Sequence, residues 1–554
     1  MTQRQYLPIA LLCLLTSTWL LGCSERPDAD PESGISESRL HAHIATLASD
    51  GFQGRAPATE GGDKTVRYLT EQFQGMLLSP GNQGSYTQDV SMVSISLETE
   101  PALEIRGQDF VRTLDYGDEA MIWSPLQQEQ IELSESELLF VGYGANAPEY
   151  DWDDYRGLDL EGKTVVMLIN DPGFATGEET LFNGRAMTYY GRWTYKFEEA
   201  ARQGAAGAII IHEDDAAGYG WEVVSGSWSG PQMALDSESD DRQLTLEGWI
   251  TTQVAEELFQ QAGYSLSEMK EAALSPDFEP VSLALNASTE LENRFERSRS
   301  QNVIAHVPGR SKPEEYIIYT AHWDHLGVDP NDSSVIYNGA VDNATGTAAV
   351  LEIARVVSEM ERAPERSMVF LLVTAEEQGL LGSRYYAENP IFPLEKTVAG
   401  INLDSMNSFG ATRDITVVGY GNSELDDYLA QAAETQNRTL RPEPHPERGY
   451  FYRSDHFSLA RHGVPVLYPN SGVEHIEHGE AFAREWMSDY QENRYHRPAD
   501  EYDPDWDLSG LVADTRLVLR TGLLLANSGD WPNWREGNEF REIRDESRQA
   551  EKNQ

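Results

Sequence analysis

Cysteine and basic residues are scarce in this chain, and each scarcity excludes a class of protein. The 554 residues include only two cysteines, Cys13 and Cys23, so a framework of several disulfides cannot hold the fold together. Lysine and arginine number 42 against 92 aspartates and glutamates, which gives a net charge of −50. Because nucleic acid is bound by basic surfaces, we expect no nucleic-acid partner. Acidity spread along the whole chain predicts a solvated surface suited to a salty medium.

Long apolar runs are also missing, which limits how the chain can meet a membrane. Arg4 is followed by an apolar stretch, 7–15, that is too short to span a bilayer comfortably. The sequence LLGC, which ends at Cys23, resembles a bacterial lipobox. This resemblance implies a signal peptide at 1–22 and a lipid on Cys23 as the only membrane contact. Ser24 then favours the cell envelope, at the outer membrane facing the periplasm or the exterior. The alternative is an ordinary secretory signal with a chance cysteine.

Composition divides the rest of the chain into segments. Polar residues at 23–37 predict a flexible tether. Apolar residues at helical spacing in 38–47 and 65–77 predict two helices that pack on a larger body. Short strands alternate with glycine-rich and acidic loops from about residue 130. We therefore expect a signal peptide at 1–22, a tether at 23–37 and an N-terminal part of the catalytic domain at 38–129. An insert at 130–285, the catalytic domain proper at 286–530 and a charged C-terminal tail at 531–554 would follow.

From residue 302 onward, strands and helices are predicted to alternate. Apolar runs at 316–320, 368–374 and 398–403 predict strands, and 345–360 has apolar residues at helical spacing. Continuous apolar runs between helices are typical of strands buried on both faces of a mostly parallel sheet. The predicted fold class is α/β, with a mostly parallel core sheet flanked by helices. The segment 130–285 would be an inserted, β-rich α/β domain.

Five residues of metal-binding type run in order through the second half of the chain, each in its own phrase. They are His322 in TAHWDHLG, Asp342 in NGAVDNATGTAAV, Glu377 in TAEEQGLLGS, Asp404 in INLDSMN and His496 in NRYHRPADEYD. Carboxylate oxygens together with neutral imidazoles suit zinc. One shared carboxylate, with one histidine and one further carboxylate for each ion, makes a site for two metals. Such a pair activates a water and polarises a carbonyl, which is hydrolase chemistry.

The positions of these residues in the predicted fold favour a common site. Four residues each follow a predicted strand by one to three positions: His322, Glu376, Glu377 and Asp404. The carboxyl ends of strands are where open α/β sheets bind ligands. Asp342 lies just before a predicted helix, with Thr345 as its expected N-cap. Since His496 lies in a loop after a long irregular stretch, only the fold can bring it to the others.

Motifs for other chemistries are missing from the sequence. There is no G-x-S-x-G for a serine nucleophile, no His-Glu-x-x-His for a single-zinc protease and no G-x-G-x-x-G for a dinucleotide. Glu376 directly precedes the ligand-type Glu377 and is free to act as a base. These observations leave metal-assisted hydrolysis as the expected reaction class.

The catalytic half resembles the co-catalytic di-zinc aminopeptidases, a family that includes bacterial leucyl aminopeptidase, aminopeptidase Y and glutamate carboxypeptidase II. The resemblance implies two Zn²⁺ per chain and peptides as substrates. It implies that one zinc is held by His322, Asp342 and Asp404. The second zinc would be held by Asp342, Glu377 and His496, so that Asp342 is shared.

The same resemblance implies two catalytic roles beside the ligands. Glu376 would take the proton from the attacking water and deliver it to the leaving amine. Asp324, in the His-x-Asp motif, would bond to the His322 imidazole and fix its tautomer. The segments ELLFVGYGANAPEYDWDDYRG and KFEEAARQGAAGAIIIHED resemble a protease-associated domain, which implies an insert that shapes or covers the substrate cleft. A purely structural insert is the alternative.

A second group of polar residues is expected near the substrate. The Ser454-Asp455-His456 phrase is similar to a cleft-lining segment of the family. The residues that we expect to contact substrate or to support the ligands are Tyr452, Ser454, Asp455 and His456. A buried, satisfied polar cluster is the alternative. His475 and His478, three residues apart, are expected at the surface.

These observations favour an aminopeptidase and leave three alternatives open. A carboxypeptidase or dipeptidase for acidic dipeptides would need arginines in the cleft, for which Arg384, Arg453 and Arg461 are available. A glutaminyl cyclase uses one zinc on this fold and is typically shorter. A binding protein that has lost catalysis, as the transferrin receptor has, would be expected to have damaged ligands or no base. Here the five ligand-type residues and Glu376 are all present.

Overall fold

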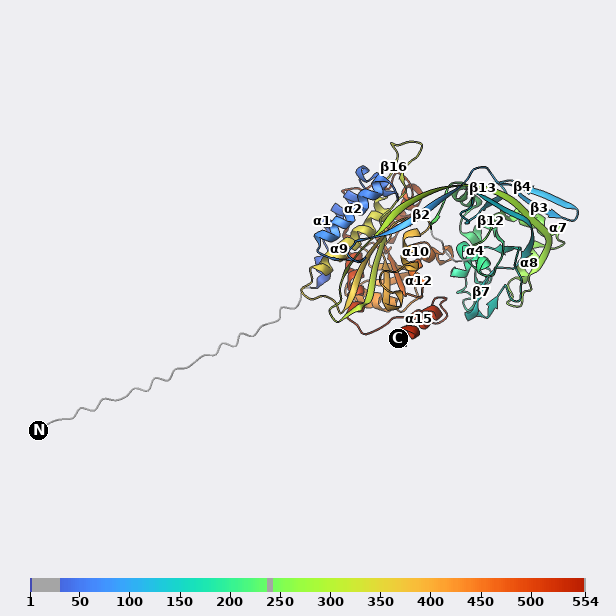
Figure 1. Cartoon of the computed structure of the whole chain (residues 1–554). Coiled ribbons are helices and arrows are strands. Elements are labelled where there is room, and N and C mark those ends of the chain that lie inside the picture. The colour runs from blue at the N-terminus through green and yellow to red at the C-terminus, as the bar shows by residue number, and fades with distance from the viewer. Residues whose placement is uncertain (2–29, 237–242, 553–554) are drawn as a thin grey trace.

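The chain forms two bodies joined by long antiparallel strands (Figure 1). The computed structural model describes Met1 and residues 30–236 and 243–552. The expected signal peptide and Cys23 therefore lie outside the described residues. Among the residues that the structure describes, no helix is long and apolar enough to cross a membrane.

The larger body is built on a sheet whose core is parallel. Strand β14 (Lys312–His322) pairs in parallel with β17 (Arg366–Val373) on one side and with β18 (Thr397–Asn402) on the other. Strand β21 (Val466–Asn470) continues the parallel order beyond β18. Strands β17 and β18 are buried along their whole length because helices cover both faces, which explains the uninterrupted apolar runs in their sequences.

Antiparallel strands extend this sheet at both edges. Strand β13 (Val281–Val307) pairs with β17 and with β2 (Thr87–Leu97). At the other edge, β19 (Asp414–Val418) runs antiparallel to β21. The remaining short strands of this sheet are β1 (Ser79–Pro80), β11 (Gln232–Leu235) and β20 (Thr439–Pro442). The predicted fold class, a mostly parallel core sheet flanked by helices, is confirmed.

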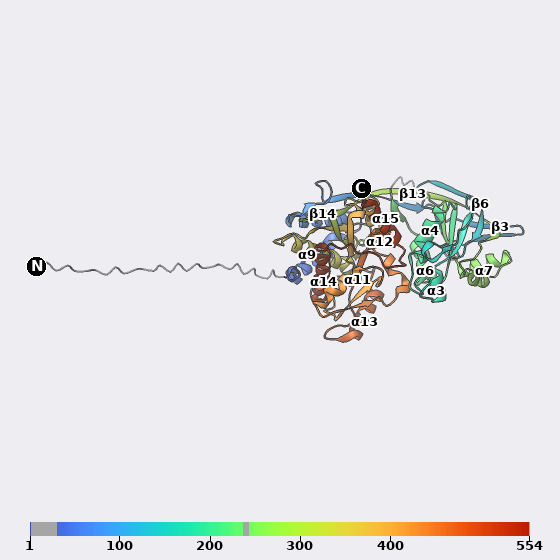
Figure 2. The ribbon, with the colours of Figure 1, turned by 90° about the horizontal axis from the view of Figure 1, so that it is seen from below.

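Helices cover the two faces of the large sheet. One face packs into the main hydrophobic core beneath α1 (Glu37–Leu47), α2 (Glu60–Gly75), α9 (Gly346–Ser358), α11 (Leu425–Glu434) and α14 (Ser509–Ala526). The other face packs against α10 (Leu381–Glu388) and α12 (His456–Ala460). Two further helices, α13 (Gly479–Asp489) and α15 (Arg541–Lys552), lie outside these layers, and Figure 2 shows α13 at the rim of the large body.

The smaller body is a second sheet with its own three hydrophobic clusters. Its strands are β3 (Leu103–Gly107), β4 (Phe110–Leu114), β5 (Ala120–Trp123), β6 (Gln130–Phe140), β9 (Thr164–Leu168), β10 (Gly207–His212) and β12 (Leu246–Thr251). Its helices are α3 (Pro172–Thr176), α4 (Trp193–Arg202), α5 (Asp214–Ala217), α6 (Trp221–Trp228), α7 (Thr252–Gln261) and α8 (Leu266–Ala272). A two-stranded ribbon of β7 (Asn146–Ala147) and β8 (Trp152–Asp153) completes it.

The boundaries of this insert differ from the expected 130–285. Strands β3, β4 and β5 precede residue 130 but belong to the second sheet, and β13 pairs with β6 as far as Glu292. The single strand β13 then continues into the large sheet, as its arch across both bodies in Figure 1 shows. The chain leaves the insert within one continuous strand, so no turn or linker marks this exit in the sequence, whereas a short loop at 98–102 separates β2 from β3 at the entry.

The expected tether and tail are in part packed on the large body. Residues Pro31–Gly34 form a short 3₁₀ helix, Ile35 is buried, and Glu32 pairs with Arg520. At the other end, Trp534 is completely buried. Buried apolar residues fix both polar stretches, Ile35 in the first and Trp534 with Phe540 in the second, and composition averaged over a stretch does not reveal them.

The insert touches the large body beside the loop that precedes α12. Tyr189 stacks on Tyr452 at 6.2 Å, and Arg461 donates to Glu198 at 2.8 Å. The backbone N–H of Met187 donates to the carbonyl of Pro446 at 3.1 Å. The insert is therefore held next to the segment that carries Ser454.

Candidate metal centre

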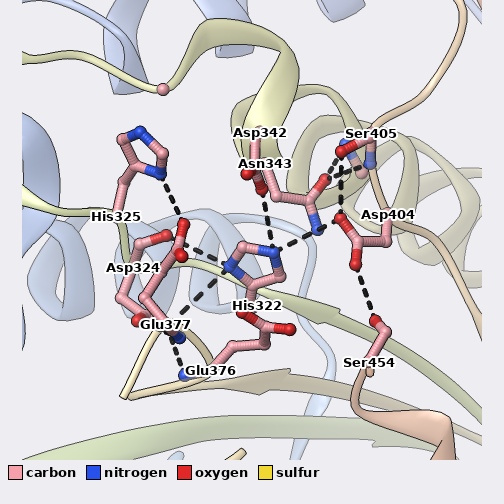
Figure 3. A network of polar contacts seen from close by, with 12 residues as sticks. His322, Asp324, His325, Asp342, Asn343, Glu376, Glu377, Asp404, Ser405 and Ser454 are labelled. Atoms are coloured by element: carbon pink, nitrogen blue, oxygen red, sulfur yellow. Dashed lines mark hydrogen bonds and ion pairs between the residues drawn. The ribbon is translucent and has the colours of Figure 1, made fainter. Parts of the chain in front are cut away.

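The ligand-type residues meet at the carboxyl edge of the parallel strands (Figure 3). His322 is the last residue of β14, Asp404 follows the end of β18, and Glu376 and Glu377 follow β17. Asp342 lies in the turn Ala340–Thr345 that enters α9. The side chains that follow β14, β17 and β18 converge because parallel strands end at one edge of the sheet, and the turn before α9 brings Asp342 to the same edge.

Asp342 lies between the two histidines and presents one oxygen to each. Its Oδ1 is 3.2 Å from Nε2 of His322, and its Oδ2 is 3.2 Å from Nε2 of His496. Each histidine also faces a second carboxylate: Asp404 Oδ1 is 3.3 Å from His322, and Glu377 Oε2 is 3.0 Å from His496. The five residues therefore form two groups, each with one histidine and one further carboxylate, that share Asp342.

Neighbouring side chains orient two of the carboxylates. Ser454 donates its hydroxyl to Oδ2 of Asp404 at 2.6 Å and accepts from Nδ2 of Asn402 at 2.8 Å. His325, which the sequence analysis did not single out, places Nδ1 2.6 Å from Oε1 of Glu377. Thus Asp404 and Glu377 each use one oxygen for orientation and turn the other toward a histidine.

The turn that carries Asp342 is capped by a side chain other than the expected one. Asn343 accepts from the backbone N–H of Gly346 at 2.9 Å, so that its amide caps the start of α9. Thr345 instead donates its hydroxyl to the carbonyl of Val341 at 2.7 Å. Both contacts fix the backbone beside Asp342.

Burial and crowding perturb the charges at this centre. Burial alone would lower the pKa of His322, but Glu376 and Asp404 outweigh it and raise this pKa well above the usual range. Burial would raise the pKa of Asp342, yet hydrogen bonds from His322 and His496 lower it well below the usual range. For Glu376, burial and the neighbouring carboxylates outweigh His322 and raise the pKa well above the usual range. A carboxylate with a raised pKa is a stronger proton acceptor than an ordinary one.

Asp324 supports the centre in a different way from the one expected. Its carboxylate is 3.9 Å from Nδ1 of His322, which lies instead 3.1 Å from the Asp324 backbone carbonyl. The two carboxylate oxygens accept the backbone N–H groups of Glu376 and Glu377 at 3.2 and 3.4 Å. Asp324 therefore positions the Glu376–Glu377 pair through the backbone, and the imidazole is held by a carbonyl.

The four residues expected near substrate fall into three groups. Ser454 bonds to Asp404, as described above. Asp455 and His456 are buried, Asp455 beside the hydroxyl of Ser383 and His456 beside the backbone of Phe451. Burial raises the pKa of Asp455 to about 7 and lowers that of His456 to about 3. Tyr452 lies apart from the cluster, because its hydroxyl donates to Glu539 at 2.7 Å on the side facing the insert.

Other polar groups that the sequence analysis did not find reinforce the ligands from outside. Asp500 and Arg55 are fully buried beside the Asp342 segment. Tyr495 stacks on His496 with ring centroids 3.9 Å apart. Asp500 and Tyr495 lie close in sequence to His496, and this was the only sequence signal for them. Arg55 lies far in sequence from every ligand-type residue. His475 and His478 stack on each other, and Nδ1 of His475 accepts backbone N–H groups of its own loop.

The donor set fits zinc. Ligand atoms of His322, Asp342 and Glu377 lie within 4.8 Å of one another, and so do those of His322, Glu376 and Asp404. Imidazole nitrogens mixed with carboxylate oxygens are a zinc-type donor set. The carboxylates here outnumber the histidines in a buried site, so a cation is the natural counter-charge.

Comparison with known proteins supports a peptidase domain. Residues 302–519 match the model of peptidase family M28. The chain is 37% identical over 142 residues to the aminopeptidase NAALADL1 of Mus musculus, a match that covers 24% of this chain and 18% of that protein. It is 33% identical over 127 residues to a glutamate carboxypeptidase 2 homolog of Caenorhabditis briggsae, which covers 22% of this chain and 15% of that protein. The matches thus span about a fifth or less of these relatives' lengths.

Solved structures of aminopeptidases align with most of the chain. An aminopeptidase from Aneurinibacillus sp. strain AM-1 has a TM-score of 0.49 at 20% identity, over 91% of this chain and 97% of that one. A zinc aminopeptidase from Bacillus subtilis has a TM-score of 0.42 at 17% identity, over 91% of this chain and 98% of that one.

Proposed function

We propose that this chain is a zinc-dependent exopeptidase of peptidase family M28, and that it acts as an aminopeptidase with two zinc ions per chain. The observation that carries the proposal is Asp342, whose two oxygens face the two histidines from between them. The match of residues 302–519 to the family model supports it. The names of the relatives, which include an aminopeptidase and a carboxypeptidase homolog, support a peptidase in general.

In this proposal each zinc is held by the residues of one of the two groups described by the structure. His322, Asp342 and Asp404 would hold one zinc, and Asp342, Glu377 and His496 the other. When bound, a zinc pair supplies polarisation of the substrate carbonyl and acidification of water. The chain's own residues supply the proton transfer and the positioning. Asp324 holds Glu376 in place by accepting the backbone N–H of Glu376.

Glu376 is the general base in this account. Its carboxylate would take a proton from the attacking water and pass it to the nitrogen of the leaving amine as the peptide bond breaks. Burial raises its pKa, which makes the carboxylate a stronger proton acceptor than an exposed glutamate. The neighbouring Glu377 is occupied by His325 and His496 and is not free for this task.

Glu376→Gln separates catalysis from metal binding. The amide keeps the shape but cannot accept the proton, so we expect kcat to fall by about 10²–10⁴-fold while two zinc ions stay bound. Peptide hydrolysis and zinc content are measured on the same preparation. Unchanged kcat in the zinc-loaded variant would refute the assignment of the base.

A carboxypeptidase on the same fold is the second candidate. It is favoured by the arginines beside the insert, of which Arg453 lies directly before Ser454. The buried Nε of Arg453 has no hydrogen-bond partner among the described residues. Cleavage that needs a free C-terminus and ignores blocking of the N-terminus would select this alternative. A glutaminyl cyclase or a silent binding protein would show no hydrolysis of any peptide.

We also propose that the chain is a lipid-anchored protein of the cell envelope. The support is the LLGC sequence ending at Cys23, with the lipid as the only membrane contact. Peptides are the proposed partners, and the net charge of −50 argues against nucleic acid. Metabolic labelling with a fatty acid, lost in Cys23→Ser, tests the anchor. The insert, which touches the loop before α12, is proposed to border the substrate cleft.

A further inference from the structure

The backbone segment 338–342, which ends at Asp342, is held by a buried arginine on one side. Arg55 donates from Nη1 to the carbonyl of Asn338 at 2.6 Å and from Nη2 to that of Gly339 at 2.8 Å. The same guanidinium reaches Trp323, the residue after the ligand His322, by donating from Nε to its carbonyl at 2.9 Å. One buried group therefore ties together the two segments that carry His322 and Asp342.

A close approach of the chain places Arg55 there. Gly54 has a φ of +63°, and a Cβ at this position would lie 2.4 Å from the carbonyl oxygen of Tyr337 and 2.5 Å from that of Gly327. These residues belong to the ribbon of β15 (Gly327–Val328) and β16 (Ile336–Tyr337) that leads into the Asp342 segment. Only glycine fits against this ribbon, and the next residue then points its side chain inward.

On the other side, a buried carboxylate holds the same segment. Asp500 accepts the backbone N–H of Val341 at 3.0 Å and that of Asp342 at 3.1 Å. The hydroxyl of Tyr490 donates to the same carboxylate at 3.2 Å. The backbone carbonyl of Asp500 accepts the N–H of Ala340 at 3.1 Å.

The two groups complement each other in charge. Arg55 is completely buried, and its four hydrogen bonds described by the structure all go to backbone carbonyls. Burial lowers its pKa to about 10, and the carboxylate of Asp500, followed by that of Asp324, most strongly opposes this shift. The guanidinium of Arg55 binds carbonyl groups of segment 338–342, and the carboxylate of Asp500 binds its N–H groups. The peptide units of the segment are therefore held from both sides.

We propose that Arg55 and Asp500 form a backbone clamp that sets the position of Asp342 between the two metals. The clamp consists of these two residues and acts on segment 338–342. Both are positioning residues, since neither touches substrate or presents an atom to the ligand groups. The proposal rests on the proposed function in one respect, that Asp342 is shared by two metal ions.

The clamp would affect both metal positions, because Asp342 is shared between them. One oxygen of Asp342 serves each histidine, so a displacement of its backbone moves both metal positions together. Metal and catalytic constellations tolerate displacements of only about 0.5 Å. The residues that fix the backbone should therefore control affinity for both ions.

Two variants and two matched controls test the clamp. Asp500→Asn keeps the shape but replaces one acceptor by an amide donor, and Arg55→Lys keeps the charge but cannot span three segments. Asp414→Asn is the matched control for the first, because Asp414 accepts the N–H groups of Val473 and Glu474 at 2.9 and 2.8 Å in another loop.

For the arginine, the control is Arg544→Lys. Arg544 is also buried and donates to the carbonyl of Thr397 at 3.0 Å, on the far side of the large sheet. The full chain without its signal peptide is stripped of metal, checked for folding by circular dichroism, and titrated with zinc against a chromophoric chelator. The absorption spectrum of the cobalt-loaded protein reports the ligand geometry.

We expect Asp500→Asn and Arg55→Lys to lower zinc affinity by about 10–100-fold and to change the cobalt spectrum, while both controls bind zinc like the wild type. Wild-type affinity and spectrum in Asp500→Asn or Arg55→Lys would overturn the clamp. If Asp500→Asn does not fold, the Arg55→Lys result decides alone.

The same titration separates this inference from the proposed function. Wild-type protein that binds fewer than two zinc ions would overturn the shared site and the clamp together. Wild-type protein that binds two ions but cleaves no peptide would overturn the peptidase alone, and the comparison of variants would still judge the clamp.

Discussion

The hydroxyl of Ser454 offers a direct measure of how much a neighbour of the ligands contributes to metal binding. It donates to Asp404 at 2.6 Å, accepts from Asn402 at 2.8 Å, and is buried. Ser454→Ala removes both contacts without changing the charge of the centre. Asp404 then keeps His322 as a neighbour but loses the bond that orients its second oxygen.

The expected size of the effect follows from the kind of bond. A hydrogen bond to a charged group contributes about 1.5–3 kcal/mol, and about 1.4 kcal/mol corresponds to a tenfold change in affinity. We therefore expect about a 10–100-fold weaker affinity for the zinc held by Asp404, which agrees with the usual effect of losing a residue that supports a ligand. The second zinc should be affected less, because Glu377 and His496 do not contact Ser454.

Competition titration against a chromophoric chelator resolves the two binding steps. Ser383→Ala is the matched control, since the hydroxyl of Ser383 pairs with that of Ser458 at 3.0 Å on the adjoining helices. Ser454→Thr should restore affinity because it keeps the hydroxyl. Zinc affinities of Ser454→Ala within twofold of wild type at both steps would refute the reasoning.

Three further predictions concern the whole chain and the insert. Zinc should raise the Tm of the metal-free protein, because it neutralises buried carboxylates; equal melting curves with and without zinc would contradict this. Lys196 is buried, donates to three carbonyls at 2.5, 2.7 and 2.9 Å and lies beside the buried carboxylate of Asp171, so Lys196→Met, which leaves that carboxylate without a cation, should destabilise the insert by about 3–5 kcal/mol, whereas Lys163→Met should not; urea denaturation followed by tryptophan fluorescence measures both. Burial raises the pKa of Glu247 to about 8, above its unfolded value, so its contribution to stability is present below pH 4.5 and is lost as pH rises through 8. Glu247→Gln should therefore flatten the decline of stability from pH 5 to 8, and an unchanged profile would argue against it.

The sequence was sufficient to predict the elements that carry the ligands. His322, Glu377 and Asp404 each follow an uninterrupted apolar run, and such runs become strands of a parallel core, whose ends meet at one edge. His496 could be paired with them only by resemblance, because the loop that bears it reaches Asp342 through tertiary packing.

Residues that act through the backbone could not be predicted. Asp500 and Arg55 bind N–H and carbonyl groups of segment 338–342, and peptide groups leave no trace in the pattern of side chains. Asp324 was expected at an imidazole and instead accepts backbone N–H groups. The start of the insert was placed too late because β3, β4 and β5, which precede residue 130, belong to its sheet, and its end was placed too early because β13 joins both sheets without a break.

The central claim is that the two-metal centre removes residues from the free N-terminus of peptides. The most direct measurement is zinc-dependent release of the first residue from a peptide panel, offered in free and N-acetylated forms to metal-stripped and zinc-restored protein. The account predicts release that requires zinc and is abolished by acetylation. Equal cleavage of acetylated peptides, or no cleavage of any peptide by zinc-loaded protein, would contradict it.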